Sequence, residues 1–192
     1  MADSLRRRLS LEEFLAWEER QENRNEFVDG RIRAMVGATR RHNKVARNVL
    51  AHLLHRLGSG KCQPYGSDMK ILIPNGNSRY GDVTVDCGPE KPEDIAATAP
   101  TVVVEVLSKS TAFLDQTHKL GDYQSIPSMR HILHLAQERA EGELWTRDEN
   151  GWRRSSLAGL DAVVGLTAIG VSFVLAIAYE GVVLDEEGAA ET

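Results

Sequence analysis

The chain has 192 residues, of which 42% are hydrophobic and 27% are charged, and its formal net charge is −5. This length and composition fit one globular domain that is large enough to bury a core. The negative charge argues mildly against a nucleic-acid-binding protein, although basic residues gather at 6–8 and 40–47. Such clusters can meet phosphates, but a solvated helix face is the simpler interpretation.

The cysteines and the N-terminus indicate a reducing compartment. Cys62 and Cys87 have no CxxC spacing, so we expect two free thiols rather than a disulfide. The first residues, MADSLRRRLSLEEF, lack the apolar stretch of a signal peptide. The protein is therefore expected in the cytoplasm.

The first half of the chain shows two amphipathic helices and several short strands. Ser10 and Glu13 have the spacing of a capping box, which predicts a helix start. A second helix has Val45, Val49 and Leu53 at steps of four residues. In chain order we expect a helix at 10–19, a hairpin at 25–37, a helix at 40–60 and strands near 62–66, 69–73, 82–87 and 101–107.

The second half is expected to hold a helix at 110–125, capped by Ser110 or Thr111, and then an antiparallel meander. Its strands are predicted at 129–136, 142–147 and 151–157. The segment at 162–179 has 18 residues without a charge, which is near the lower limit for a membrane span. No basic anchor follows it. A buried strand plus a short helix is therefore favoured over a membrane-associated protein.

Two acidic residues occupy unusual places in neighbouring predicted strands. Asp82 opens the strand in RYGDVTVDCG (79–88), and Glu105 lies within the apolar run PTVVVEVLSKST (100–111). Because side chains alternate along a strand, Glu105 shares its face with Val103 and Leu107. A lone carboxylate buried there is strongly destabilising unless it is paired or bound to a cation.

A metal ion would explain this pair of acids. Two carboxylates, together with waters and a substrate phosphate, are the usual way in which proteins hold Mg²⁺. Such an ion activates water and neutralises charge on a phosphodiester. Lys119 follows on a predicted helix that can return over the strand end, where it would place a cation beside the phosphate. Asp115 precedes Lys119 by four residues, so an ordinary helix ion pair is the alternative.

Six segments in order resemble one branch of the PD-(D/E)xK nuclease superfamily, the Uma two family of restriction-endonuclease-like proteins. They cover most of the chain. The segments are NEFVDGRI (25–32), RHNKVARNVLAHL (41–53), RYGDVTV (79–85), VVVEVLSKST (102–111), DQTHKLGDY (115–123) and AYEGVVL (178–184).

The resemblance implies an α/β (α+β) fold with a restriction-endonuclease-like core, in which helices flank a central mixed sheet. Residues 1–184 would form one domain and 185–192 an acidic flexible tail. The implied activity is hydrolysis of DNA phosphodiesters with Mg²⁺ or Mn²⁺, often by a homodimer, without an organic cofactor.

The resemblance also assigns site residues by position. Asp82 and Glu105 would be metal ligands, and the backbone carbonyl of Val106 would add a third oxygen. Lys119 would be the catalytic lysine, and Glu26 would match an acidic residue of the family's N-terminal part.

Two positions depart from the superfamily pattern. The proline that usually precedes the aspartate is Gly81, which predicts a looser start of the strand. The lysine that usually follows the glutamate by two residues is Leu107. Lys119 must therefore supply the cation. If it does not, the chain is a catalytically inactive module that binds nucleic acid or a protein partner.

Three further polar residues are weaker candidates for the site. His42 begins the helix at 40–60 within a basic cluster, where it could contact DNA or cap the backbone. Asp68 and Lys70 lie on a strand close to Asp82 in sequence, and either could assist.

Overall fold

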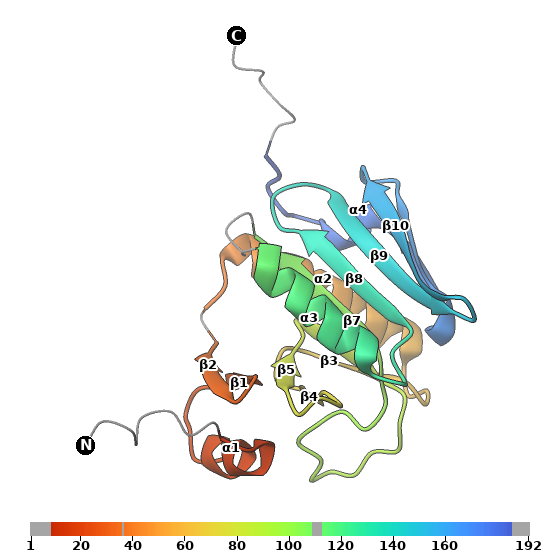
Figure 1. The fold of residues 1–192 in the computed structure, drawn as a ribbon. Helices are drawn as coiled ribbons and strands as arrows, with labels where there is room; N and C mark the ends of the chain where they lie inside the picture. The colour runs from red at the N-terminus through yellow and green to blue at the C-terminus, as the bar shows by residue number, and fades with distance from the viewer. Residues whose placement is uncertain (1–8, 36, 109–112, 186–192) are drawn as a thin grey trace.

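A mixed sheet of six strands forms the centre of the computed structural model, which describes residues 9–35, 37–108 and 113–185 (Figure 1). The strand order is β10-β9-β8-β7-β6-β3. Only β7 and β8 run parallel among these neighbours, and α3 (Phe113–Ser125) lies between them in the chain. The strands are β3 (Gln63–Tyr65), β6 (Val83–Asp86), β7 (Pro100–Leu107), β8 (His131–Ala136), β9 (Glu141–Asp148) and β10 (Gly151–Ala158).

A smaller antiparallel sheet has the strand order β2-β1-β5-β4. Its strands are β1 (Asn25–Val28), β2 (Arg31–Ala34), β4 (Lys70–Leu72) and β5 (Ser78–Tyr80). Helix α1 (Leu11–Glu18) packs on this sheet, where the rings of Phe14 and Phe27 stack with centroids 4.8 Å apart. Figure 1 shows this sheet and α1 at the lower left of the central sheet.

Helices cover both faces of the central sheet, as expected from the resemblance. Figure 1 shows α3 in front of the sheet and α2 (Arg40–Leu57) behind it. The α2 side buries Val102, Val104 and Val106 of β7, and the α3 side buries Val103 of the same strand. The alternation predicted from the sequence is confirmed, and it turns Glu105 towards α3.

Most elements of the first half begin and end where local sequence signals place them. The capping box forms, because Ser10 accepts from the Glu13 N–H and Glu13 accepts from the Ser10 N–H. The hairpin turns at Asp29 and Gly30, both with positive φ. Strand β5 was not predicted, because its three residues are defined by pairing with β1 and β4 rather than by a local pattern. The predicted caps Ser110 and Thr111 lie outside the described residues.

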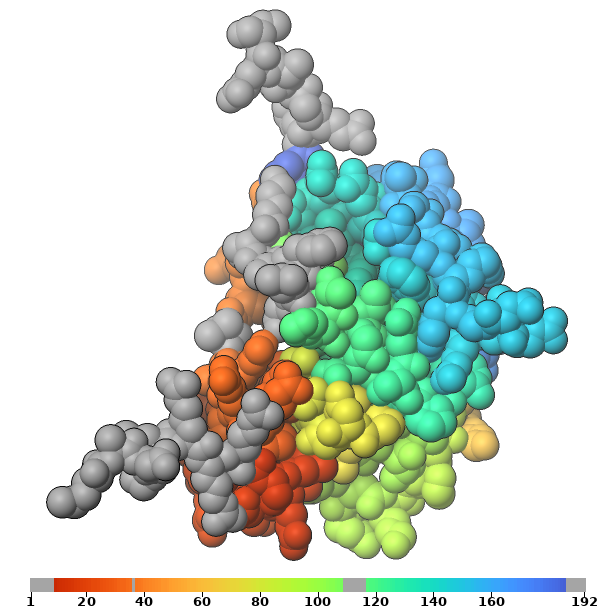
Figure 2. All heavy atoms as spheres, viewed as in Figure 1, coloured from red at the N-terminus to blue at the C-terminus, as the bar shows by residue number. Residues whose placement is uncertain are grey.

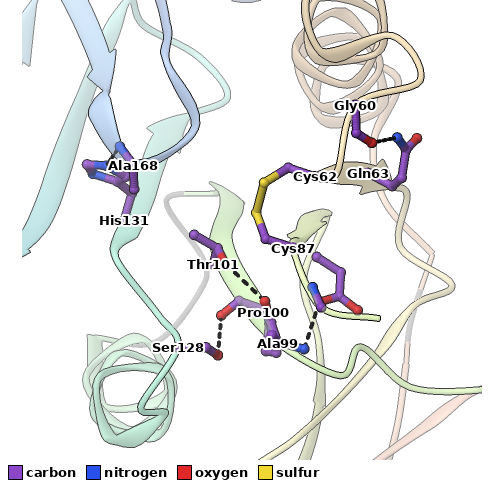
Figure 3. Close-up of a disulfide and its surroundings, with 12 residues drawn as sticks. Gly60, Cys62, Gln63, Cys87, Ala99, Pro100, Thr101, Ser128, His131 and Ala168 are labelled. Carbon is purple, nitrogen blue, oxygen red and sulfur yellow. Dashed lines mark hydrogen bonds between the residues drawn. A yellow bond between two sulfur atoms is a disulfide. The ribbon is translucent and has the colours of Figure 1, made fainter. Parts of the chain in front are cut away.

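The prediction of free cysteines is wrong, because Cys62 and Cys87 form a disulfide (Figure 3). Cys62 immediately precedes β3, and Cys87 immediately follows β6. These strands are antiparallel neighbours in which Gln63 pairs with Asp86. The sulfur atoms therefore meet across the sheet, a proximity that depends on strand register and not on spacing along the chain.

The apolar segment at 162–179 forms short elements, as favoured from the sequence. They are β11 (Val163–Leu166), the 3-10 helix η1 (Thr167–Ile169), β12 (Val171–Val174) and α4 (Leu175–Ala178). Within the described ranges, none of the helices has the length and apolar composition needed to cross a bilayer.

The predicted acidic tail lies mostly outside the described residues, which end at Asp185. The carboxylate of Asp185 lies 2.7 Å from the guanidinium of Arg41, and its N–H donates to the carbonyl of Glu138. The first residue of the predicted tail is thus held against α2 and the loop after β8.

Candidate active site

The antiparallel pairing of β6 with β7 brings Asp82 close to Glu105. Val83 pairs with Val104, so Asp82, one residue before β6, lies beside the last residues of β7. Oδ2 of Asp82 accepts a hydrogen bond of 2.7 Å from the N–H of Val106. The two acids that sequence analysis singled out therefore lie at one end of two adjacent strands.

Glu105 is the more enclosed of these two acids, because its side chain is only 9% exposed. Its oxygens accept from Tyr123 Oη at 2.6 Å and from Lys119 Nζ at 3.0 and 3.2 Å. Burial raises the pKa of Glu105 to about 7, even though the charge of Lys119 opposes the rise. The negative charge of Asp82 adds to it.

The ammonium group of Lys119 contacts residues of both sheets. Besides Glu105, Nζ lies 3.1 Å from Oε1 of Glu26 on β1 and donates to the carbonyl of Tyr80 at 3.3 Å. Burial works to lower the pKa of Lys119, but Glu105 and Glu26 outweigh it, so the pKa lies above the ordinary value. The side chain of Asp115, the alternative partner, lies outside what the structure describes.

A buried arginine that sequence analysis missed holds Glu26 in place. Arg79 on β5 is fully buried and contacts Glu26 at 3.0 Å and Asp122 of α3 at 2.8 Å. Asn75 and Asn77 also donate to Asp122. The missed β5 thus carries the residue that connects β1 to α3.

Tyr123 is the second residue that sequence analysis missed. It is fully buried, and its hydroxyl is 2.6 Å from Glu105. Its position four residues after Lys119 is a signal that was available, because such residues share one helix face. Burial and the charge of Glu105 both raise the pKa of Tyr123, so the phenol is a donor and not an anion.

The imidazole of His42 contacts the carboxylate of Asp82. Its Nε2 is 2.9 Å from Oδ1 of Asp82, and its side chain is 18% exposed. The hydroxyl of Thr39 accepts a hydrogen bond from the N–H of His42 and so caps the start of α2. This bond fixes the backbone position from which the His42 side chain extends. Burial lowers the pKa of His42, but the hydrogen bond and charge of Asp82 outweigh this, so the pKa is raised.

Asp68 and Lys70 are not brought to this cluster. Lys70 is buried against Glu18 at 2.7 Å, and Asp68 pairs with Arg24 at the surface. The expectation of a loose strand start at Gly81 is also wrong. Gly81 is buried, and a Cβ there would overlap the side chain of Val103.

The chemistry of the site suits a hard divalent cation. Asp82 and Glu105 supply carboxylate oxygens, and the repulsion between them that raises the pKa of Glu105 is one that a cation relieves. In the described part of the chain, no group of three or more His, Cys, Asp or Glu side chains is placed to hold a metal. Mg²⁺ does not need such a cage, because it keeps several waters and takes one or two carboxylates.

Comparison with known proteins finds related sequences over most of the chain. The Uma2 family, described as "Putative restriction endonuclease", matches residues 11–178. The chain is 34% identical over 177 residues to the uncharacterized protein slr1290 of Synechocystis sp. (strain ATCC 27184 / PCC 6803 / Kazusa), covering 91% of this chain and 93% of that one. It is 30% identical over 161 residues to sll1609 of the same organism, covering 81% of this chain and 91% of that one.

A solved structure shares the fold. It is a crystal structure from Anabaena variabilis ATCC 29413, described as "a putative nuclease belonging to DUF820". The TM-score is 0.72 at 14% sequence identity, over 89% of this chain and 97% of that chain. The predicted fold class is thereby confirmed, and the match along the sequence shows that the chain belongs to the Uma2 family of restriction-endonuclease-like proteins.

Proposed function

We propose that this protein is a metal-dependent endonuclease that hydrolyses DNA phosphodiesters. The observation that carries the proposal is the contact of a nearly enclosed Glu105 with Lys119, beside Asp82 at the ends of β6 and β7. A carboxylate pair with an adjacent cation matches what hydrolysis of a phosphodiester requires. Membership of a family described as "Putative restriction endonuclease" supports the same reaction class.

Asp82 and Glu105 would hold Mg²⁺ or Mn²⁺, and the backbone carbonyl of Val106 would add an oxygen. When bound, the ion supplies a Lewis acid that lowers the pKa of a water and neutralises phosphate charge. Tyr123 donates to Glu105 from the protein interior and so orients its carboxylate. The N–H of Val106 does the same for Asp82.

Lys119 would stabilise the negative charge that develops on the phosphoryl oxygens. In hydrolysis, a water oxygen forms a bond to phosphorus, one ester P–O bond breaks, and the leaving oxygen gains a proton. Lys119 has three N–H groups, and its recorded partners are Glu105, Glu26 and the carbonyl of Tyr80. A phosphate oxygen would replace one of these partners, and Glu26 would keep the ammonium group aimed at the site.

A homodimer is part of this proposal, since one site per strand suits the cleavage of both strands of a duplex. A cytoplasmic location is also part of it, although the Cys62–Cys87 disulfide removes the argument from free thiols.

A catalytically inactive binding module is the second candidate. Leu107 replaces the superfamily lysine, and Lys119 is already surrounded by acceptors, so the site could serve as a charged core that performs no chemistry. This candidate expects binding of nucleic acid or of a protein partner without cleavage, and no Glu105-dependent binding of Mg²⁺.

Cleavage of supercoiled plasmid and of single-stranded DNA tests the proposal. Wild type, Glu105→Ala and Glu105→Gln would be compared in Mg²⁺, in Mn²⁺ and in EDTA. Glu93→Gln is the matched control, because Glu93 is exposed in the loop after β6. Metal-dependent cleavage that only the Glu105 variants lose supports the nuclease. Equal cleavage by all variants, or none by wild type together with no Glu105-dependent Mg²⁺ binding by calorimetry, overturns it.

A further inference from the structure

A pocket of about 660 Å³ opens beside the candidate site, on the α3 side of the central sheet. Leu107 and His134 form its near wall, and Thr117 and Leu120 of α3 form one flank. Thr117 and Leu120 stand on either side of Lys119 in the sequence, and Leu107 follows Glu105 by two residues. The catalytic cluster and the pocket therefore share both α3 and β7.

Strands β9 and β10 form the far wall. Figure 1 shows that α3 covers β7 and leaves β9 and β10 uncovered, and Figure 2 shows the surface of α3 in green bordering their blue surface. The strand register connects the site to this wall. Glu105 pairs with His134, His134 pairs with Glu143, and Glu143 pairs with Ser156. Neighbouring strands lie about 4.8 Å apart, so Glu143 is roughly 10 Å across the sheet from Glu105.

The pocket combines apolar walls with a polar edge. Leu120 and Trp145 provide apolar surface. At the rim, Arg154 Nη1 contacts Glu143 Oε1 at 3.1 Å, and the Arg154 guanidinium lies over the Trp145 ring at 6.0 Å. Both side chains of this ion pair are more than one-third exposed, which leaves donors and acceptors available to a ligand.

The charge of the lining favours a neutral ligand. Glu141 and Glu143 line the pocket, and they would repel a phosphate. A planar heterocycle with apolar faces and a polar edge fits better, because an arginine donates to base acceptors and a glutamate accepts from base amino groups.

We propose that this pocket binds one unpaired nucleobase of the DNA strand whose phosphate lies at Glu105 and Lys119. The inference rests on the proposed function and specifies its substrate as DNA with an extrahelical or single-stranded base next to the cleavage site. Enzymes that act on DNA can take up such a base in a shaped pocket, and the energy needed is smallest when the base is already unpaired. The volume lies in the range of ordinary ligand sites.

Binding of short fluorescein-labelled duplexes tests the proposal through fluorescence anisotropy, with Ca²⁺ in place of Mg²⁺. One duplex set carries a single bulged nucleotide with each of the four bases, and the matched duplex carries an abasic nucleotide at the same place. Wild type should bind at least one bulged base about ten-fold more tightly than the abasic duplex, since stacking contacts per base are of this size.

Two variants remove the charges of the polar edge, and a third is a control on the opposite face of β10. Arg154→Gln and Glu143→Gln should each reduce the preference for the base. Arg153→Gln should retain it, because Arg153 is exposed on the opposite face of β10, bonded to Ser155. A general loss of positive charge would affect both arginine variants equally, so the comparison isolates the pocket.

Equal binding of the abasic and bulged duplexes, no binding of either, or an equal effect of Arg153→Gln overturns the proposal. The result is separate from the cleavage test. A base preference in a protein that does not cleave would reject the nuclease and retain the pocket. Cleavage without a base preference would retain the nuclease and reject the pocket as a base-binding site.

Discussion

The ammonium group of Lys119 lies 3.0 Å from Oε1 of Glu105, although 14 residues separate the two in the sequence. Helix α3 returns along β7 and brings the lysine back to the acid from the preceding strand. Leu107, where the superfamily pattern has its lysine, lies two residues further along β7 on the face of Glu105. The cation at this site therefore comes from a helix and not from the strand.

Lys119→Met is expected to reduce cleavage by roughly a hundred-fold or more, a typical loss when one group that stabilises transition-state charge is removed. It should also destabilise the fold, because Glu105 and Glu26 would remain buried without their cation. Plasmid cleavage and urea denaturation measure the two effects. Lys61→Met, at an exposed position after α2, is the control.

A lysine on β7 should partly replace the missing cation. In the Lys119→Met protein, adding Leu107→Lys places an ammonium group on the same strand face as Glu105. We expect some cleavage to return, measured under the same conditions. Failure of this double variant in a folded protein would show that the helix position itself is required.

Tyr123→Phe removes the hydrogen bond of 2.6 Å from the phenol to Glu105. Above pH 7, where Glu105 is ionised, the loss of this hydrogen bond to a buried carboxylate should lower the free energy of unfolding by about 1.5–3 kcal/mol. Mg²⁺ affinity should change, because the carboxylate of Glu105 loses one of its orienting partners. Calorimetric titration with Mg²⁺ checks this, and unchanged affinity in Tyr123→Phe would show that the phenol has only a structural role.

Arg79→Met should lower the free energy of unfolding by about 3–5 kcal/mol, since the buried carboxylates of Glu26 and Asp122 lose their partner. Arg79→Lys should not restore it fully, because one ammonium group does not reproduce the planar guanidinium that contacts both acids. Chemical denaturation measures each variant. A triple variant with Glu26→Gln and Asp122→Asn should recover part of the loss, and Arg153→Met is the surface control.

Stability should fall as the pH drops from 6.5 towards 4, partly because of His131. Burial, helped by Arg130, lowers the pKa of His131 to about 4, and its Nε2 accepts from the N–H of Ala168 at 3.1 Å. The unfolded chain binds a proton near pH 6.5 and the folded chain does not, so the contribution is present above that pH and is lost below it. Its upper limit is about 3 kcal/mol.

His131→Gln tests this by keeping an acceptor that does not titrate. Its free energy of unfolding should depend less steeply on pH over this window than that of wild type. His134 also has a lowered pKa and the raised pKa of Glu105 acts in the opposite direction, but both are present in the two proteins and cancel in the difference. Equal slopes would contradict the assignment.

Alkylation followed by mass spectrometry tests the disulfide. Alkylation of the unfolded protein without reductant should label neither Cys62 nor Cys87, and both should be labelled after reduction. Reduction should lower the free energy of unfolding by about 3 kcal/mol for a loop of this length. A Cys62→Ala/Cys87→Ala variant should resemble the reduced protein, and full labelling before reduction would contradict the bond.

Much of the fold could be predicted because it depends on local or periodic signals. The alternation of apolar residues on β7 predicted which face carries Glu105, and the capping box at Ser10 predicted where α1 begins. The ordered set of family segments predicted the sheet and its helices. The positions of Asp82, Glu105, Lys119 and Glu26 around one point follow from that topology.

The rest depends on contacts between distant segments. Arg79 bonds to Glu26 and Asp122, which are 53 and 43 residues away, and a charged residue is normally expected at the surface. Strand β5 and the Cys62–Cys87 pair are defined by strand register, which a single sequence does not display. Helical periodicity could have predicted that Tyr123 shares a helix face with Lys119. The partner of its hydroxyl group, however, lies on another element.

The contacts of Lys119 show that the candidate site lies between two separately hydrogen-bonded sheets and contains residues of both. Glu26 comes from the small sheet, Glu105 from the central one, and Arg79 ties the small sheet to α3. Detachment of the small sheet would therefore disperse the charged cluster while the central sheet still holds together. In the proposed nuclease, cleavage would then require the small sheet to stay docked, and warming should abolish cleavage before the main unfolding transition begins.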